Sequence, residues 1–337
     1  MREIIRLHMN EMPYPPSPSV VKAAQQGLAR LNRYADPAEL GALQELLAGY
    51  CGVPRDRVIL SPGSELLLRE VIHTFSQGRR VITVSPSFFP TVQAAKQFAA
   101  EWLSIRLTPP AFDLNTKLLM EVLKGPSLVI LDNPNNPTGR LLLGPPVVNN
   151  LLQQENVLLV IDEAYYEFSG VTFADRVADH PRLAVIRTMD KAFSLAGARV
   201  GYGIVGEAFG DVLSSFYAFL PRPSLRAAME ALKRPEDMRE NVRRVVGERE
   251  RLRRALDELG VHLYPSSTNF LLVRSEVPDL VRRLRDEGVL VSDVSNQLPA
   301  GFFRVSIGTP GENDAFLAAL AEQIRANSPG ADGQPWR

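Results

Sequence analysis

The chain has 337 residues, with 38 Lys and Arg against 38 Asp and Glu, so its formal net charge is zero. This balance argues against a protein that binds nucleic acid or an anionic membrane through bulk positive charge. Hydrophobic residues make up 45% and charged residues 23%, which excludes disorder as the main state and indicates a globular protein of two domains, or of one large domain with an appendage.

The single cysteine, Cys51, excludes a disulfide framework within the chain and a cysteine-rich zinc site. The four histidines are scattered without the spacing of metal ligands, so we expect no metal. No apolar run reaches the roughly 18 residues that a membrane-spanning helix needs. The N-terminus lacks the pattern of a signal peptide. We therefore expect a cytoplasmic protein with neither a membrane nor a nucleic acid as partner.

Four prolines between residues 13 and 18 predict an extended N-terminal arm, because proline removes a backbone donor and fixes φ. An amphipathic helix is expected from about Val20 to Leu31, with Ser19 as its N-cap. A second helix is expected from about Ala38 to Tyr50.

Short apolar runs then alternate with helical segments or loops. Runs that are apolar at every position are typical of strands buried on both faces, as in a parallel sheet covered by helices. These observations predict an α/β domain with a mostly parallel sheet between helices. The expected strands are Val58–Leu60, Val81–Val84, Leu128–Leu131, Val157–Ile161, Ala184–Ile186 and Val200–Val205.

From about Pro235 the pattern indicates a smaller α+β domain. The expected order is a helix to about Leu259, a strand at 270–273, a helix at 277–287, a strand at 303–307 and a helix at 312–326. Interleaved Arg and Glu residues in the first of these helices predict a solvated face with i,i+4 ion pairs. We assign residues 1–30 to an arm and helix joining the small domain, 31–230 to the large domain, 231–327 to the small domain and 328–337 to a disordered tail.

Polar residues follow two of the buried strands. Asn136 lies in the segment LDNPNNPTGR, and Asp162 and Glu163 end the run VLLVID. Parallel α/β sheets place their sites at the carboxyl ends of strands. A surface turn explains the first segment equally well, and a helix N-cap could explain Asp162. A buried carboxylate needs a partner, and a pyridinium nitrogen would be one.

Lys191 follows the next strand, and Arg199 comes eight residues later. A lysine at a buried strand end beside another cation can have a lowered pKa and act as an amine nucleophile. Taken alone, a lysine is most often a surface residue. The nearby glycines do not form a dinucleotide-binding fingerprint.

Together, these segments resemble the fold type I aminotransferases that depend on pyridoxal 5'-phosphate (PLP), and within them the histidinol-phosphate aminotransferases. The resemblance rests on NPNNPTG, VIDEAYYEF, the lysine and the arginine eight residues on. The segments LHMNEMPYPPSP, LNRYADP, SPGSELL and FFRVSIGTPGEND also match family motifs in order. The matches run from about residue 4 to about residue 325.

The resemblance implies roles around the cofactor ring. Lys191 would form a Schiff base with PLP and move a proton between the substrate and the cofactor. Asp162 would pair with the pyridinium nitrogen. Tyr165 and Asn136 would bond the 3'-oxygen of the ring. Phe88 stands where the family has a stacking tyrosine.

The resemblance also implies which residues hold the cofactor phosphate. Gly63 and Ser64, before a helix, together with Arg199 and Thr188, would bind the cofactor phosphate. Tyr34 would reach that phosphate from a neighbouring subunit, which implies a homodimer with shared sites.

For the substrate, Arg304 would hold the α-carboxylate as a bidentate pair, and Asn10 in the arm would help close the site. Arg222 stands where the substrate loop of the family is expected, so it is a candidate substrate ligand.

Two positions depart from the family pattern. Asp190 replaces the serine or threonine that precedes the lysine and donates to the cofactor phosphate. A carboxylate would repel that phosphate, so Asp190 must point elsewhere or be neutralised. Ala315 replaces an arginine that grips the substrate phosphate in histidinol-phosphate enzymes.

The resemblance implies an aminotransferase of amino-acid biosynthesis that moves an α-amino group between an L-amino acid, or histidinol phosphate, and a 2-oxo acid. One alternative is a PLP-dependent decarboxylase of the threonine-phosphate type. Another is an aminotransferase for an unphosphorylated amino acid in specialised biosynthesis. A third is a binding or regulatory module that kept the fold without the activity.

Overall fold

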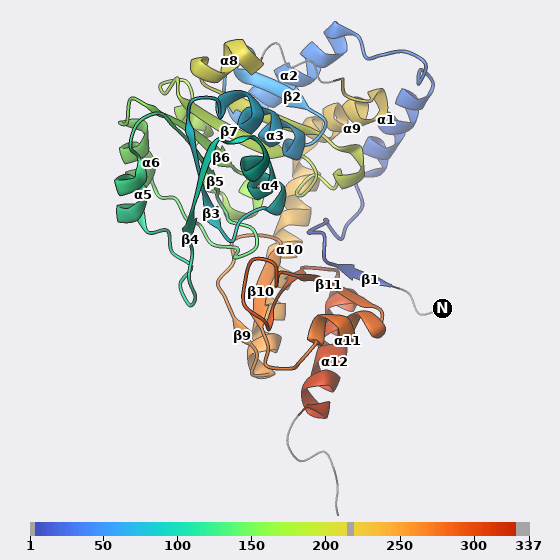
Figure 1. Cartoon of the computed structure of the whole chain (residues 1–337). Coiled ribbons are helices and arrows are strands. Elements are labelled where there is room, and N and C mark those ends of the chain that lie inside the picture. The colour runs from blue at the N-terminus through green and yellow to red at the C-terminus, as the bar shows by residue number, and fades with distance from the viewer. Residues whose placement is uncertain (1–3, 214–218, 328–337) are drawn as a thin grey trace, which may run out of the picture.

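The structure is a computed structural model that describes residues 4–213 and 219–327 (Figure 1). It contains a larger α/β domain and a smaller α+β domain. The long helix α10 (Pro235–Glu258) runs from one to the other, as Figure 1 shows. The tail expected at 328–337 lies outside the described residues.

In the described residues the large sheet has seven strands; β8 runs antiparallel to β2 and β7, and the other paired strands run parallel to one another. Asp132 pairs in register with Asp162, so β5 and β6 end side by side. The prediction of a mostly parallel sheet is confirmed. Across the sheet the strands are β2 (Val58–Ser61), β8 (Gly201–Val205), β7 (Leu183–Thr188), β6 (Val157–Asp162), β5 (Ser127–Asp132), β3 (Arg80–Ser85) and β4 (Glu101–Arg106).

Helices cover both faces of this sheet. In the central strands, alternate residues belong to two separate apolar clusters: Leu128 and Ile130 to one, Val129 and Leu131 to the other. Burial on both faces explains the continuous apolar runs of the sequence. Helices α3 (Ser64–Phe75), α4 (Phe89–Phe98) and α8 (Glu207–Leu213) pack on one face, and α2 (Pro37–Cys51), α6 (Pro145–Leu152) and α9 (Arg222–Lys233) contribute to the cluster on the other. The shorter helical segments are α5 (Thr116–Val122), α7 (Tyr166–Ser169), η1 (Arg55–Arg57), η2 (Ala174–Arg176) and η3 (Ala196–Ala198).

The small domain is built on a five-stranded sheet with helices α11 (Leu280–Asp286) and α12 (Pro310–Ala326). The sequence reading missed β1, β4, β9 and β11 because they are short or carry charged and polar residues among the apolar ones. Across the small sheet the order is β1 (Ile5–Leu7), β11 (Val289–Asp293), β12 (Phe302–Ser306), β10 (Phe270–Arg274) and β9 (His262–Leu263).

The N-terminal segment divides between the two domains. Strand β1 joins the small sheet, parallel to β11. Helix α1 (Pro18–Leu28) packs on α9, so the segment assigned to the small domain also contacts a helix of the large one. The contact is close: a Cβ on Gly27 would lie 2.7 Å from Pro223 Cα. The helix begins with Pro18 after Ser17, two residues earlier than expected, because proline suits the first helical position.

The charged face of α10 also differs from the prediction. Its ion pairs join glutamates to arginines three residues later, as in Glu240–Arg243 and Glu250–Arg253, rather than four. Arg249 is buried and donates to the carbonyl oxygen of Thr268 at 2.8 Å. This arginine therefore ties α10 to the small domain instead of facing solvent.

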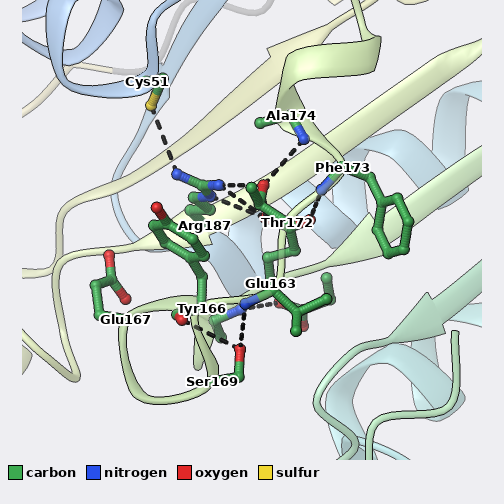
Figure 2. Close-up of polar contacts among 12 residues, drawn as sticks. Cys51, Glu163, Tyr166, Glu167, Ser169, Thr172, Phe173, Ala174 and Arg187 are labelled. Atoms are coloured by element: carbon green, nitrogen blue, oxygen red, sulfur yellow. Dashed lines mark hydrogen bonds and ion pairs between the residues drawn. The ribbon is translucent and has the colours of Figure 1, made fainter. Parts of the chain in front are cut away.

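A buried ion pair lies beneath the ends of β6 and β7 (Figure 2). Arg187 Nη2 and Nε lie 2.9 and 3.1 Å from Glu163 Oε2, and both side chains are almost fully buried. Thr172 donates to the same carboxylate oxygen at 2.8 Å, and the Arg187 guanidinium lies 3.7 Å from the centre of the Tyr166 ring. Because Glu163 follows β6 and Arg187 lies in β7, the pair fixes the loops that follow both strands.

We expect Glu163→Gln to lower the free energy of unfolding by about 3 kcal/mol, because it leaves the Arg187 charge buried without a counter-charge. Denaturant unfolding measures this change. Glu240→Gln, on the exposed face of α10, is the matched control and should cost about 0.5 kcal/mol or less. Equal losses in the two variants would contradict the structural importance of the buried pair.

Candidate active site

A cavity of about 310 Å³ lies at the carboxyl ends of β5, β6 and β7 and is closed from the other side by the N-terminal arm and β12. It collects residues from sequence positions 9 to 304. Ten residues singled out from the sequence line it: Asn10, Ser64, Phe88, Asn136, Asp162, Tyr165, Thr188, Lys191, Arg199 and Arg304.

Lys191 projects from the loop after β7. Its Nζ donates to the carbonyl oxygen of Met9 in the arm at 3.1 Å. Burial lowers the pKa of Lys191 to about 8, against an opposing effect of Asp190. At pH 7 about a tenth of this amine is therefore neutral, far more than for an ordinary lysine, and the neutral form is the one that acts as a nucleophile or a general base.

Two carboxylates lie side by side at the end of the sheet. Asp162 is buried and accepts from the Ala164 amide at 3.0 Å. Its burial, and secondly the charge of Asp132, raise its pKa to about 7. Asp162 is thus placed to bind a cationic or proton-bearing group within the cavity.

Asp132 was not identified from the sequence, although it precedes the asparagine-rich turn. Its carboxylate accepts from the backbone amides of Phe88 at 3.3 Å and Asn136 at 2.8 Å. It also accepts from Ser87 Oγ and Asn135 Nδ2. One buried carboxylate therefore positions residues from two neighbouring loops. Its place at the end of an apolar run was the signal that could have revealed it.

Asn10 joins the arm to both domains. Its backbone is in the left-handed region, with φ 53°, and its side-chain Nδ2 donates to the Tyr165 hydroxyl at 2.8 Å. Its Oδ1 accepts from Ser306 Oγ, and its carbonyl oxygen accepts from Asn269 Nδ2. Burial raises the pKa of Tyr165 to about 12, so its hydroxyl keeps its proton and can donate.

Arg304, on β12, points into the cavity from the small domain. Its Nη1 donates to Asn136 Oδ1 at 2.5 Å and its Nη2 to the carbonyl oxygen of His8 at 2.6 Å. Its Nε is buried without a partner, and among the described residues no carboxylate forms an ion pair with it. A partly buried guanidinium that lacks a counter-charge is suited to bind an anion.

The opposite end of the cavity is a second anion-binding environment. Gly63, with φ 87°, precedes helix α3, and a Cβ there would lie 2.5 Å from Arg199 Nη2. A Cβ on Gly201 would lie 2.2 Å from the Ser64 nitrogen. Glycine at both positions allows the α3 N-terminus to lie against β8 and beside Arg199, where backbone N–H groups and a guanidinium can bind one anion.

Asp190 lies at this same end. It is buried, its Oδ2 forms an ion pair with Arg199 Nη1, and its Oδ1 has no hydrogen-bond partner. Its backbone amide donates to Thr188 Oγ1 at 3.0 Å. From the sequence, Asp190 was expected either to point away from the cofactor phosphate or to be neutralised. In the structure its side chain lines the cavity.

Three residues that the sequence singled out lie away from this cavity. Tyr34 is 76% exposed, in the segment between α1 and α2. Arg222 is buried at the start of α9, where it pairs with Glu39 at 2.9 Å and donates to the carbonyl oxygen of Tyr34 at 2.8 Å. Its prediction as a substrate ligand is not supported within this chain. Ala315 lies on α12 and lines a separate cavity with Ile5.

The described part of the chain holds no group of three or more His, Cys, Asp or Glu side chains suited to a metal ion. Within the same residues, every helix is too short or too polar to cross a bilayer.

Comparisons with known proteins agree over nearly the whole chain. The family model described as aminotransferase class I and II matches residues 2–320. The histidinol-phosphate aminotransferase of Sulfurisphaera tokodaii is 34% identical over 95% of this chain and 90% of that protein. The enzyme of the same name from Thermococcus gammatolerans is 35% identical over 97% of this chain and 94% of that protein.

Solved structures have the same fold. The histidinol-phosphate aminotransferase from Sinorhizobium meliloti in complex with pyridoxal-5'-phosphate superposes with a TM-score of 0.86 at 26% identity, over 97% of this chain and 92% of that chain. A putative aminotransferase from Burkholderia pseudomallei gives a TM-score of 0.84 at 28% identity, over 96% of this chain and 99% of that chain. The L-threonine-O-3-phosphate decarboxylase from Porphyromonas gingivalis shares the fold alone. Its TM-score is 0.82 at 22% identity, over 96% of this chain and 100% of that chain.

We expect Lys191 in the cofactor-free protein to react with an amine-acylating reagent with a midpoint near pH 8, because burial disfavours its ammonium form. Peptide mass spectrometry of protein labelled at a series of pH values measures the midpoint. Lys117, whose side chain is 88% exposed, is the internal control for the pH dependence of the reagent itself. Identical labelling profiles for the two lysines would contradict the desolvated site around Lys191.

Proposed function

The chain belongs to the aminotransferase class I and II family and is a PLP-dependent aminotransferase, and we propose that it transfers the amino group of histidinol phosphate to a 2-oxo acid. The observation that carries this proposal is Arg304, a partly buried cation without an anionic partner in the described part of the chain, which shares one cavity with Lys191. The curated relatives of that name support the choice of substrate.

The residues of the cavity fit the cofactor. Lys191 offers a partly neutral amine, and Asp162 offers a buried carboxylate for a ring nitrogen. The glycine-lined N-terminus of α3 and Arg199 suit a phosphate group. When bound, PLP supplies an aldehyde that accepts an amine and a ring that takes up the electron pair left at the substrate Cα.

The chain's own residues supply the proton transfers and the orientation. Lys191 takes the proton from the substrate Cα and returns it on the other side of the transfer. Asp162 holds the proton on the ring nitrogen. With the cofactor bound, Tyr165 and Asn136 would hold the 3'-oxygen of the ring, and Phe88 would pack against the ring face. Asp132 positions Phe88 and Asn136 through their backbone amides.

Arg304 accounts for both substrates. Histidinol phosphate carries a phosphate ester on the carbon next to Cα, where a 2-oxo acid carries its carboxylate. A guanidinium binds either anion through two parallel hydrogen bonds. Asn10, bonded to Tyr165 and Ser306, holds the arm across the cavity and excludes water from it.

We further propose a homodimer in which Tyr34 reaches the site of the neighbouring subunit. The segment around Tyr34 exposes large apolar side chains, including Leu28 at 52% and Leu31 at 68%. Such a surface is typical of an interface. Arg222 fixes this segment through the Tyr34 carbonyl oxygen and Glu39, so its role is to position Tyr34.

The proposed location is the cytoplasm, and the proposed role is in amino-acid biosynthesis. The single, unpaired Cys51 is consistent with a reducing compartment.

A panel of amino donors with 2-oxoglutarate as acceptor tests the substrate. We expect kcat/KM for histidinol phosphate to exceed that for histidine, aspartate and phenylalanine by at least about tenfold, and Arg304→Gln to lower it by about 100-fold. Arg274→Gln, on the neighbouring strand β10 with an exposed side chain, is the matched control and should change little. Faster turnover of an unphosphorylated amino acid would contradict the proposal. Release of carbon dioxide without amine transfer would indicate a decarboxylase.

Mixing two inactive variants tests the shared site. Lys191→Ala and Tyr34→Ala subunits, dissociated and reassociated together, should recover about a quarter of wild-type activity. Half of the dimers are then hybrids, and each hybrid has one site with both residues intact. If Tyr34 serves its own chain, no site in the mixture is complete and activity stays absent. Each variant alone, treated in the same way, is the control.

A further inference from the structure

A carboxylate stands in the part of the cavity that is otherwise built for an anion. Asp190 shares this end with Arg199, Thr188 and the N-terminus of α3 at Ser64. One of its oxygens pairs with Arg199, and the other, Oδ1, is buried without a partner. An ionised carboxylate that faces a phosphate would repel it at short range and would compete for the guanidinium that the phosphate needs.

The groups that face Asp190 do not remove this conflict. Arg199 and Lys191 lie on its own side of the cavity, and Glu65 at the start of α3 lies 4.0 Å from Arg199 and adds a second negative charge. On its other side Asp190 lines a cavity of about 350 Å³ with the titratable side chains of Arg6, Glu11, Tyr14 and Glu312. Burial raises the pKa of Asp190 despite the opposing effect of Arg199. A bound phosphate would add up to two further negative charges.

We propose that Asp190 takes up a proton from solvent when the cofactor phosphate binds, so that its carboxyl group donates a hydrogen bond to the phosphate and releases Arg199 to bind it. The reaction balances as one carboxylate and one proton giving one carboxylic acid. The buried oxygen without a partner becomes one end of that hydrogen bond. The inference rests on placing the phosphate between α3 and Arg199, and it is independent of which amino donor the enzyme uses.

The sign of the pH dependence follows from linkage. The complex holds one proton that free Asp190 has lost above its own pKa. Over the interval between the pKa of free Asp190 and the higher pKa in the complex, the dissociation constant rises about tenfold for each pH unit. The second ionisation of the phosphate, with a pKa of about 6, is complete above neutral pH and does not produce this slope.

Titration calorimetry with pyridoxine 5'-phosphate tests the proposal, because this ligand has the phosphate but no aldehyde for Lys191. Runs in buffers of different ionisation enthalpy give the number of protons taken up. We expect the wild type to take up about one proton more per site at pH 8 than Asp190→Asn or Asp190→Ser. These two variants should bind about tenfold more tightly than the wild type at that pH and lose the slope.

Glu65→Gln is the matched control, since Glu65 is half-exposed and lies 4.0 Å from Arg199, whereas Asp190 is buried and pairs with Arg199 directly; its proton uptake should equal that of the wild type. Equal proton uptake by wild type and both Asp190 variants would overturn the proposal. A loss of proton uptake in Glu65→Gln equal to that in the Asp190 variants would also overturn it. Failure of pyridoxine 5'-phosphate to bind any of the four proteins would remove the phosphate placement itself, whereas failure of the donor assay alone would leave this inference intact.

Discussion

Two neighbouring strands of the large sheet are joined where they end by opposite charges that water cannot reach. Two hydrogen bonds join Arg187 to one carboxylate oxygen of Glu163, to which Thr172 also donates, and the Phe173 amide donates to the other oxygen at 2.7 Å. Because breaking such a pair leaves a buried charge, the two strand ends cannot drift apart at low cost. Asp162 precedes one partner by a single residue and Lys191 follows the other by four, so the separation of the acid and the amine is set by the framework beneath them.

The cavity above this pair holds charges that lack full compensation in the cofactor-free protein. Arg304 has no counter-ion among the described residues, Asp162 lies beside Asp132, and the amine of Lys191 is desolvated. Under the proposed function each group would meet its complement in PLP or a substrate: an anion for Arg304, a ring nitrogen for Asp162 and an aldehyde for Lys191. Groups fixed in advance by the fold need little reorganisation when the ligands arrive, and this is the main source of electrostatic catalysis.

Much of the site could be predicted from the sequence, because Asn136, Asp162 and Lys191 each follow a buried strand and fall in motifs of a known family. Asp132 could not, since its importance lies in backbone amides donated by a separate loop. The direction of the Arg222 side chain, which lies away from the cavity and pairs with Glu39, could not be predicted from its position in the sequence. Strands β4 and β11 are amphipathic or marginal, and their pairing is decided by tertiary contacts that single-strand propensities do not contain. The start of α1 was displaced by Pro18, whose preference for the first turn outweighs the capping tendency of Ser19.

The N-terminal strand has a consequence beyond closing the cavity. In the small sheet, β1 covers the edge of β11, which would otherwise present unpaired backbone donors and acceptors. Exposed edges of this kind recruit strands from other molecules and lead to aggregation. The same few residues that lead to Asn10 thus protect the small sheet, so we expect a chain shortened at its N-terminus to aggregate more readily and to lose the arm beside the cavity. The arm therefore serves two purposes: it places Asn10 at the cavity, and it covers a sheet edge that would otherwise promote aggregation.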